Sequence, residues 1–423
     1  MQLKKRIITG IASTAILLNV LTPMVFADTN LIISGNGADS DNEVKVEMTQ
    51  SVTVQQSNDA DVHNNVDSNA STGGNDANRN TGGSVTVDTG NANSTVNVGT
   101  TVNSNQANVQ CNTCGGDANI TISGNGEDSD NDVDLDLGSK YHDNVSVTQN
   151  NDADVHNNVD SNASTGYNDA DRNTGGDVEI TTGNAKSDVT VKTMANANSA
   201  VIAGSQGGSS ITAEILGNGA DSDNDIDLDV HNSITVLQAN DADIHNRVDS
   251  DAKTGDNEAE RNTGGDVTID TGDATAKAKV ENKVNFNSVD ADCGCEMDIK
   301  AKIAGNGEDS DNEIEAKHLS STLGIYQGGR NEDGELGNDA DLCNDVDANA
   351  KTGYNEIDGS TGSVLGGDPE VSTGNALSDV SVSNTANANV VGPAAEWPDW
   401  SGVNLELNFS LGDLLGFLGF HLG

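Results

Sequence analysis

The sequence has few basic and few aromatic residues for its length. Its 423 residues include 20 Lys and Arg against 68 Asp and Glu, which gives a formal net charge of −48. Aromatic side chains are limited to five Phe, two Trp and four Tyr. Because a protein that binds a nucleic-acid backbone needs a basic surface, the charge argues against DNA or RNA as a partner. The lack of aromatics argues against ordinary domain cores, which rely on large side chains.

The first residues have the composition of a signal peptide. Lys4, Lys5 and Arg6 precede a mostly apolar run over residues 7–20, and small or aliphatic residues lie at 25–27. We expect a signal peptide at residues 1–27, cleaved after Ala27, and therefore a protein that is secreted or acts at the cell surface. The alternative, an N-terminal membrane anchor, is disfavoured because the apolar run is short for a span, and no later stretch is long and apolar enough to be one.

Most of the remaining chain repeats. The pattern Gly-Asn-Gly-x-Asp-Ser-Asp-Asn begins at Gly35, Gly124, Gly217 and Gly305, at intervals of 89, 93 and 88 residues. A period near ninety therefore organises the chain. We assign four repeats and a tail: residues 28–117, 118–210, 211–298 and 299–392 (the most divergent repeat), followed by a hydrophobic C-terminal cap or attachment segment at 393–423.

Within each repeat the pattern indicates β-structure. From residue 58 to 72, every second residue is small or aliphatic or is Asn, and the intervening residues are mostly acidic. Gly corners recur at spacings close to multiples of about 17 residues, which predicts an all-β, repetitive β-solenoid (parallel β-helix-like) rod with about five coils per repeat. Inward Asn residues of stacked coils would form amide ladders.

Two other architectures compete with the solenoid. Tandem β-sandwich modules of about 90 residues are favoured by the ten-residue alternating run from Asp128 to Leu137 and disfavoured by the missing aromatic core. A disordered acidic chain fits the charge, but strict alternation in four faithful copies argues against it.

The acidic runs predict a calcium-binding function. On a strand, alternate Asp side chains project to one side about 7 Å apart and repel one another unless cations neutralise them. Ca²⁺ accepts six to eight oxygen ligands in irregular geometry. The alternative is a solvated acidic face that serves only solubility. The candidate ligands are Asn36, Asp39, Asp41, Asn125, Asp128, Asp130, Asn218, Asp221, Asp223, Asn306, Asp309 and Asp311.

Known motifs are matched only in part. The EF-hand loop requires Gly at its sixth position, where this chain has Val or Ile, and the nonapeptide β-roll pattern occurs once per ninety residues instead of every nine. The segments Gln149-Asn-Asn-Asp-Ala153 and Gln238-Ala-Asn-Asp-Ala242 resemble the repeats of secreted bacterial curlin-like and β-solenoid surface proteins. This resemblance implies a secreted fibre or surface protein and carries over no functional residue.

The cysteines predict local disulfides. Cys111 with Cys114 and Cys293 with Cys295 occupy equivalent places in two repeats. With five coils per repeat the two pairs would lie about 50 Å apart, which excludes one shared zinc site. In an oxidising exterior we expect a local disulfide between Cys111 and Cys114, whereas Cys293 and Cys295 would form a more strained bond or pair between molecules.

One repeat position holds His63, His156, His245 and, in the fourth repeat, Cys343. The same coil size separates these side chains by about 24 Å along the rod, so we interpret them as outward positions and not as a metal site. Cys343 is the odd thiol and a candidate for pairing between molecules.

No catalytic constellation emerges, because the acids recur in every repeat whereas an enzyme has one distinctive cleft. The sequence predicts a non-enzymatic, secreted structural or adhesive element of a cell surface or extracellular matrix, stabilised by Ca²⁺. The segment 393–423 is expected to serve self-association or envelope attachment, with a host or matrix surface as a further partner. The alternatives are a β-helix enzyme acting on acidic polysaccharide and a soluble cation-binding protein that does not assemble.

Overall fold

The computed structural model describes residues 16–21, 29–49, 51–111, 118–138, 143–204, 209–292, 297–330, 336–362 and 368–392. Within these ranges the chain is all-β and contains no helix, as the alternating pattern predicts. The described part therefore has no helix that could cross a membrane.

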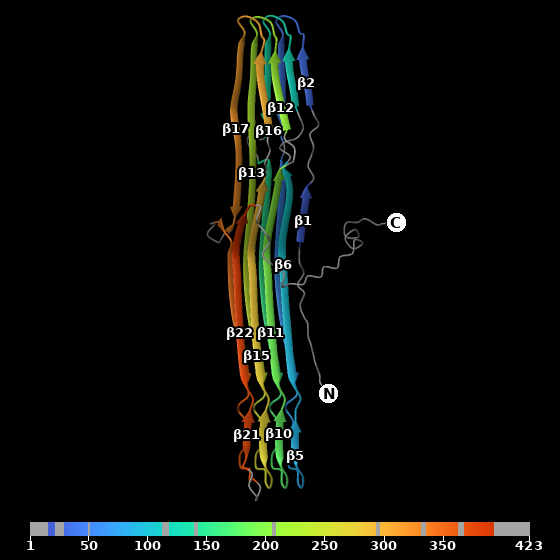
Figure 1. The fold of residues 1–423 in the computed structure, drawn as a ribbon, viewed down its shortest axis with the longest axis vertical. Helices are drawn as coiled ribbons and strands as arrows, with labels where there is room; N and C mark the ends of the chain where they lie inside the picture. The colour runs from blue at the N-terminus through green and yellow to red at the C-terminus, as the bar shows by residue number, and fades with distance from the viewer. Residues whose placement is uncertain are drawn as a thin grey trace, which may run out of the picture.

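Four parallel sheets contain nearly all of the strands (Figure 1). The first has the order β1 (Ile16–Leu21), β6 (Ala92–Cys111), β11 (Ala185–Gly204), β15 (Ala274–Asp292) and β22 (Ala376–Val391). The second has the order β5 (Val85–Asp88), β10 (Val178–Thr182), β14 (Val267–Thr271) and β21 (Glu370–Thr373). The third has the order β2 (Thr29–Ser34), β7 (Ala118–Ser123), β12 (Ser209–Leu216) and β16 (Met297–Ala304).

The fourth sheet carries the acidic runs. It contains β3 (Asp41–Met48), β8 (Asp130–Leu137), β4 (Val52–Ser71), β9 (Val145–Ser164) and the long β13 (Asp223–Lys253), with β17 (Asp311–Gln327) and β20 (Asp339–Lys351) paired to β13. The short β18 (Gly329–Arg330) and β19 (Leu336–Gly337) form an antiparallel pair.

Strands pair with their equivalents in the neighbouring repeats. Asn103, Asn196, Asn285 and Asn387 form one hydrogen-bonded line, and successive members lie 93, 89 and 102 residues apart in the sequence. Stacked strands are thus separated by a whole repeat, so the predicted coil of about 17 residues is wrong. Tandem sandwiches would pair strands within a repeat, and among the described strands only β18 and β19 do so. The sandwich alternative is therefore also wrong.

Two layers face each other within a repeat. Gln56 on β4 donates to the carbonyl of Gln106 on β6, and Ser94 on β6 donates to Ser68 on β4. From the first contact to the second, the residue number rises along β4 and falls along β6. The facing strands β4 and β6 therefore run in opposite directions. The 31 residues of β13 extend about 100 Å, whereas four strands stacked about 4.8 Å apart occupy about 14 Å. The long axis of the molecule in Figure 1 therefore runs along the strands. The prediction that it runs along the stack of coils is wrong.

The core is made of small aliphatic side chains in lines across the repeats. One cluster contains Val96, Val189 and Val248, and another contains Ile120, Ile215 and Leu135. Alternation with period two places these residues between the layers and the acids outside. Buried polar residues join the core because their amides bond along the stack, as the sequence predicts. Asn105, for example, donates to Asn198 at 3.0 Å and to Asn151 on the facing layer at 2.9 Å.

Candidate functional site

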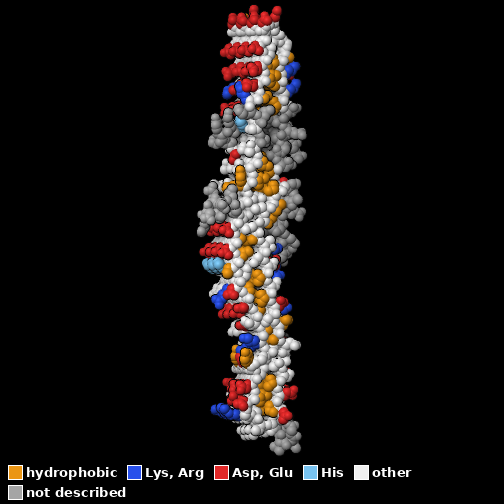
Figure 2. All heavy atoms as spheres, turned by 90° about the vertical axis from the view of Figure 1, so that its left-hand side faces the viewer, with side chains coloured by type: hydrophobic (Ala, Val, Ile, Leu, Met, Phe, Trp, Pro, Cys, Tyr) orange, Lys and Arg blue, Asp and Glu red, His pale blue; other side chains and the backbone are white. Residues whose placement is uncertain are grey.

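The candidate site is the acidic outer surface. Because the repeats are in register, equivalent acids form rows across the strands, visible as horizontal red rows in Figure 2. Asp132 and Asp225 are β-partners. Partial burial, and then the charges of neighbouring carboxylates, raise the pKa of Asp132 and of Asp225. The rows thus hold negative charge at a free-energy cost that protons or cations would relieve.

Three of the four predicted Asn ligands accept hydrogen bonds from the backbone of the neighbouring turn. The side-chain oxygen of Asn125 accepts from the backbone N–H of Asn36 at 3.0 Å, and that of Asn218 accepts from the N–H of Asn125 at 3.1 Å. Asn306 does the same for Asn218 at 3.0 Å. These amides tie successive Gly-Asn-Gly turns together. These hydrogen bonds alone therefore explain why the Asn recurs in the repeats, and no bound ion is needed to explain it.

The predicted Asp ligands lie outside these turns in two rows. The first row, with φ values of 53° to 58°, occupies the left-handed turn position, and the second row begins the strands and is paired in register. All eight side chains are exposed. The rows are Asp39, Asp128, Asp221 and Asp309, and Asp41, Asp130, Asp223 and Asp311. None of them belongs to a group of three acidic, His or Cys ligand atoms within 4.8 Å of one another in the described chain, so their calcium role stays a prediction.

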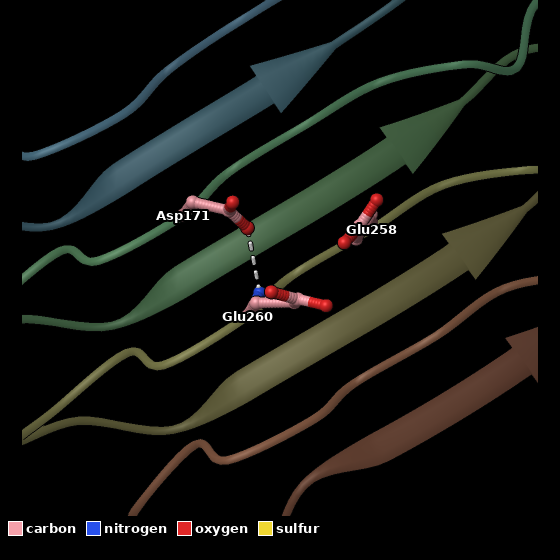
Figure 3. A group of neighbouring side chains, drawn as sticks. All are labelled: Asp171, Glu258 and Glu260. Atoms are coloured by element: carbon pink, nitrogen blue, oxygen red, sulfur yellow. Dashed lines mark hydrogen bonds between the residues drawn. The ribbon is translucent and has the colours of Figure 1, made fainter.

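Carboxylates do converge at another position, in the segments that precede β10, β14 and β21. Oxygens of Asp171, Glu258 and Glu260 lie within 4.8 Å of one another, as do those of Glu260, Glu356 and Asp358. Figure 3 shows the first group, in which Asp171 accepts from the backbone N–H of Glu260 at 2.9 Å. Asp171 is buried and Glu260 is half-buried, whereas Glu356 and Asp358 are exposed.

Two carboxylates at this position have a raised pKa. A hydrogen bond with the Glu260 carboxyl group, followed by burial and the charges of Glu260, Asp171 and Asp169, raises the pKa of Glu258 to about 7. Burial, and then a hydrogen bond with Asp171, raise the pKa of Asp169. A set of oxygen ligands that shares a proton in this way is chemically suited to a hard dication such as Ca²⁺.

The sequence analysis missed this group, although a signal was present. The pattern Asn-acid-Ala-acid-Arg-Asn occurs at residues 168–173 and 257–262. In the second of these segments Arg261 lies 3.7 Å from Glu260. The proximity of acids 89 residues apart depends on the register, which the alternation alone does not reveal.

The cysteine distances also change. Cys111 is the β-partner of Gly204, and Ala203 is the β-partner of Asp292, which precedes Cys293. The strand ends flanking the two pairs are thus about 10 Å apart and not about 50 Å. Cys114, Cys293 and Cys295 lie outside the described residues, and the disulfides stay predictions. Cys343 is free and exposed.

The chain matches no known protein family, curated protein or solved structure.

Proposed function

We propose that this chain is an exported structural protein of β-solenoid type, in which one repeat forms one coil. Copies of the protein stack in the same direction as the repeats, with the first repeat of one copy on the fourth repeat of the next. The in-register columns and the facing layers of each repeat support the solenoid. The observation that carries the assembly is the open face of the fourth repeat.

The fourth-repeat face exposes residues that are core residues elsewhere. Val96 and Val189 are 1% and 2% exposed, whereas Val380, in the same column, is 46% exposed. Nine of the eleven exposed large hydrophobic side chains among the described residues belong to this repeat: Ile314, Leu323, Tyr326, Tyr354, Val371, Leu377, Val380, Val382 and Val391. An apolar face of this kind marks an interaction surface.

The amide ladder gives the stack a direction. Asn198 Nδ2 donates to Asn287 Oδ1, and Asn287 Nδ2 donates to Asn389 Oδ1, both at 3.0 Å. In this Asn column the fourth repeat therefore ends on an amide donor, and the first repeat presents the corresponding acceptor, Asn105 Oδ1. The Gln column runs in the opposite direction, with Gln327 Nε2 donating to Gln238 Oε1. A second copy would continue both the ladder and the valine columns, with Val96 and Val98 next to Val380 and Val382. Such a head-to-tail contact does not close on itself and produces a filament.

Export would open the other end. Within the described residues, β1 pairs with Ser104–Val109 of β6. This strand lies inside the predicted signal peptide, so cleavage after Ala27 would leave that part of the first repeat as an unpaired edge. Unpaired parallel edges are templates for pairing with another chain.

Calcium has a defined place in this proposal. Stacking copies would put acids next to acids at every row, and the net charge of −48 opposes it. Ca²⁺ bound between carboxylates of adjacent strands would remove that repulsion. The acids recur in every repeat, which fits a structural role and not a single catalytic cleft.

Electron microscopy and sedimentation of the mature chain, residues 28–423, test the assembly. We expect filaments in Ca²⁺ and monomers in EDTA. Val382→Asp, in the valine column that the next copy would cover, should abolish the filaments. Ser381→Asp, on the outward side of the same strand, should leave them. Monomers in all conditions would contradict the proposal. If only a chain ending at residue 392 assembles, the tail covers the face and copies do not stack on it in the intact protein.

A further inference from the structure

Four Asn-Gly pairs lie at equivalent turns of the repeats and begin at Asn36, Asn125, Asn218 and Asn306. An Asn followed by Gly is prone to deamidation, because glycine has no Cβ to hinder the attack of its backbone nitrogen on the Asn side chain. That nitrogen bonds to the side-chain carbonyl carbon, and the amide group leaves as ammonia with the proton of the attacking N–H. Water then opens the cyclic imide to Asp or isoaspartate.

The preceding repeat holds both reacting groups in the second, third and fourth repeats. The side-chain oxygen of Asn125 accepts from the backbone N–H of Asn36 at 3.0 Å. The N–H of Gly126 donates to the carbonyl of Gly37 at 3.3 Å. The third repeat makes two bonds of the same kind at 3.1 and 2.9 Å, and the fourth at 3.0 and 2.9 Å. Deamidation in these repeats therefore requires that hydrogen bonds to the preceding repeat break first.

The pair at Asn36 lacks this protection. Among the described residues, the side-chain oxygen of Asn36 accepts no hydrogen bond and the N–H of Gly37 has no acceptor. Both residues are exposed, whereas Asn125 and Asn218 are each 4% exposed. Asn36 Nδ2 donates to Asn42 at 2.5 Å, but the other three Asn residues make the equivalent bond, so this contact does not distinguish them.

We propose that Asn36 deamidates spontaneously in the unassembled protein and that stacking protects it. The second part rests on the proposed function. In a stack, the Asn306 N–H of the adjacent copy would donate to Asn36 Oδ1, and the Gly37 N–H would donate to the Asn306 carbonyl, as in the contacts between repeats. Deamidation before stacking would place an added charge or a lengthened main chain at this contact. A modified first repeat would therefore no longer accept another copy.

Peptide mass spectrometry of the mature chain, kept monomeric in EDTA at mildly alkaline pH, tests the modification. We expect Asn36 to convert at least about tenfold faster than the other three Asn residues, because each hydrogen bond that must open slows the reaction several-fold. The chain unfolded in urea gives the rates that the local sequence alone sets. Gly37→Ala is the matched control, because a Cβ there meets nothing within 4 Å and yet hinders the attack. It should slow conversion of Asn36 and leave the other three unchanged.

Equal conversion of the four Asn residues in the folded monomer would overturn the modification site. In sedimented filaments Asn36 should convert roughly tenfold more slowly than in monomers. Filaments in which Asn36 converts as fast as in monomers would refute the protection without contradicting assembly. If no filaments form, the proposed function and the protection both fail, and the comparison within the monomer still decides whether Asn36 is the modified residue.

Discussion

Replacing one amide inside the ladder should destabilise the protein strongly. Asn198 is fully buried and donates to Asn240 and Asn287 at 2.9 and 3.0 Å. It also accepts from Asn105 and Asn151 at 3.0 and 2.8 Å. Asn198→Ala removes these four hydrogen bonds and leaves each of the four buried neighbours one hydrogen bond short, although each keeps another amide partner.

The expected loss follows from the number of bonds. At about 1 kcal/mol for each bond, the free energy of unfolding should fall by about 4 kcal/mol. Asn198→Leu fills the space but still breaks the ladder, so it should lose a similar amount. Asn97→Ala, at an exposed position of β6, should change stability by less than about 0.5 kcal/mol.

Urea unfolding followed by circular dichroism measures these differences. The comparison of Asn198→Leu with Asn198→Ala separates the hydrogen bonds from the cavity. If Asn198→Leu were as stable as the unsubstituted protein, the amides would contribute nothing and the reasoning would be refuted. If Asn97→Ala lowered the free energy of unfolding as much as Asn198→Ala, the buried amide column would contribute no more to stability than an exposed amide.

Three further predictions concern the acids and the turns. A carboxyl group whose pKa is raised by folding stabilises the protein below its unfolded pKa and loses that contribution as pH rises through the folded value. The free energy of unfolding should therefore fall from pH 5 to pH 8, with Glu258 at about 7. Glu258→Gln should flatten this dependence in urea titrations, and a stability that rises with pH would contradict it. Ca²⁺ should raise the melting temperature at pH 8 more than at pH 5, and an equal shift at both would argue against binding at the proton-sharing acids. Gly166→Ala should prevent native folding, because a Cβ would lie 1.7 Å from the Gly255 carbonyl oxygen, whereas Gly353→Ala, open at the end of the same column, should be tolerated; circular dichroism of both distinguishes them.

The sequence allowed the strands and the amide ladders to be predicted, but not the strand pairing. Alternation shows that Val96 and Val98 point to one side, and it does not show which strand lies beside them. Gly corners about 17 residues apart fitted short coils, yet they are turns and bends inside one long coil. The faithful period near ninety was itself the stacking period, since every column consists of equivalent residues.

The candidate sites follow the same logic. In the sequence, the acids at 169–171 and 258–260 look like ordinary alternating residues. Only the register shows that they lie side by side in adjacent repeats. His63, His156 and His245 occupy one repeat position, and the incorrect coil length predicted a separation of about 24 Å. Their rings in fact stack with centroids 4.8 and 4.9 Å apart. Strand register, and not residue type, determined which predicted residues came together.

Zero-length carbodiimide coupling of the unsubstituted protein, read by mass spectrometry, tests the register most directly. It joins amines to carboxylates already in contact, such as Lys45 with Asp134 at 2.6 Å and Lys300 with Glu214 at 3.4 Å. We expect these links, together with Lys192 to Glu281 at 3.6 Å, in monomeric protein. Short coils would separate such pairs by about 24 Å. Links confined to residues close in sequence, with none between equivalent positions of neighbouring repeats, would contradict the stacked-repeat structure.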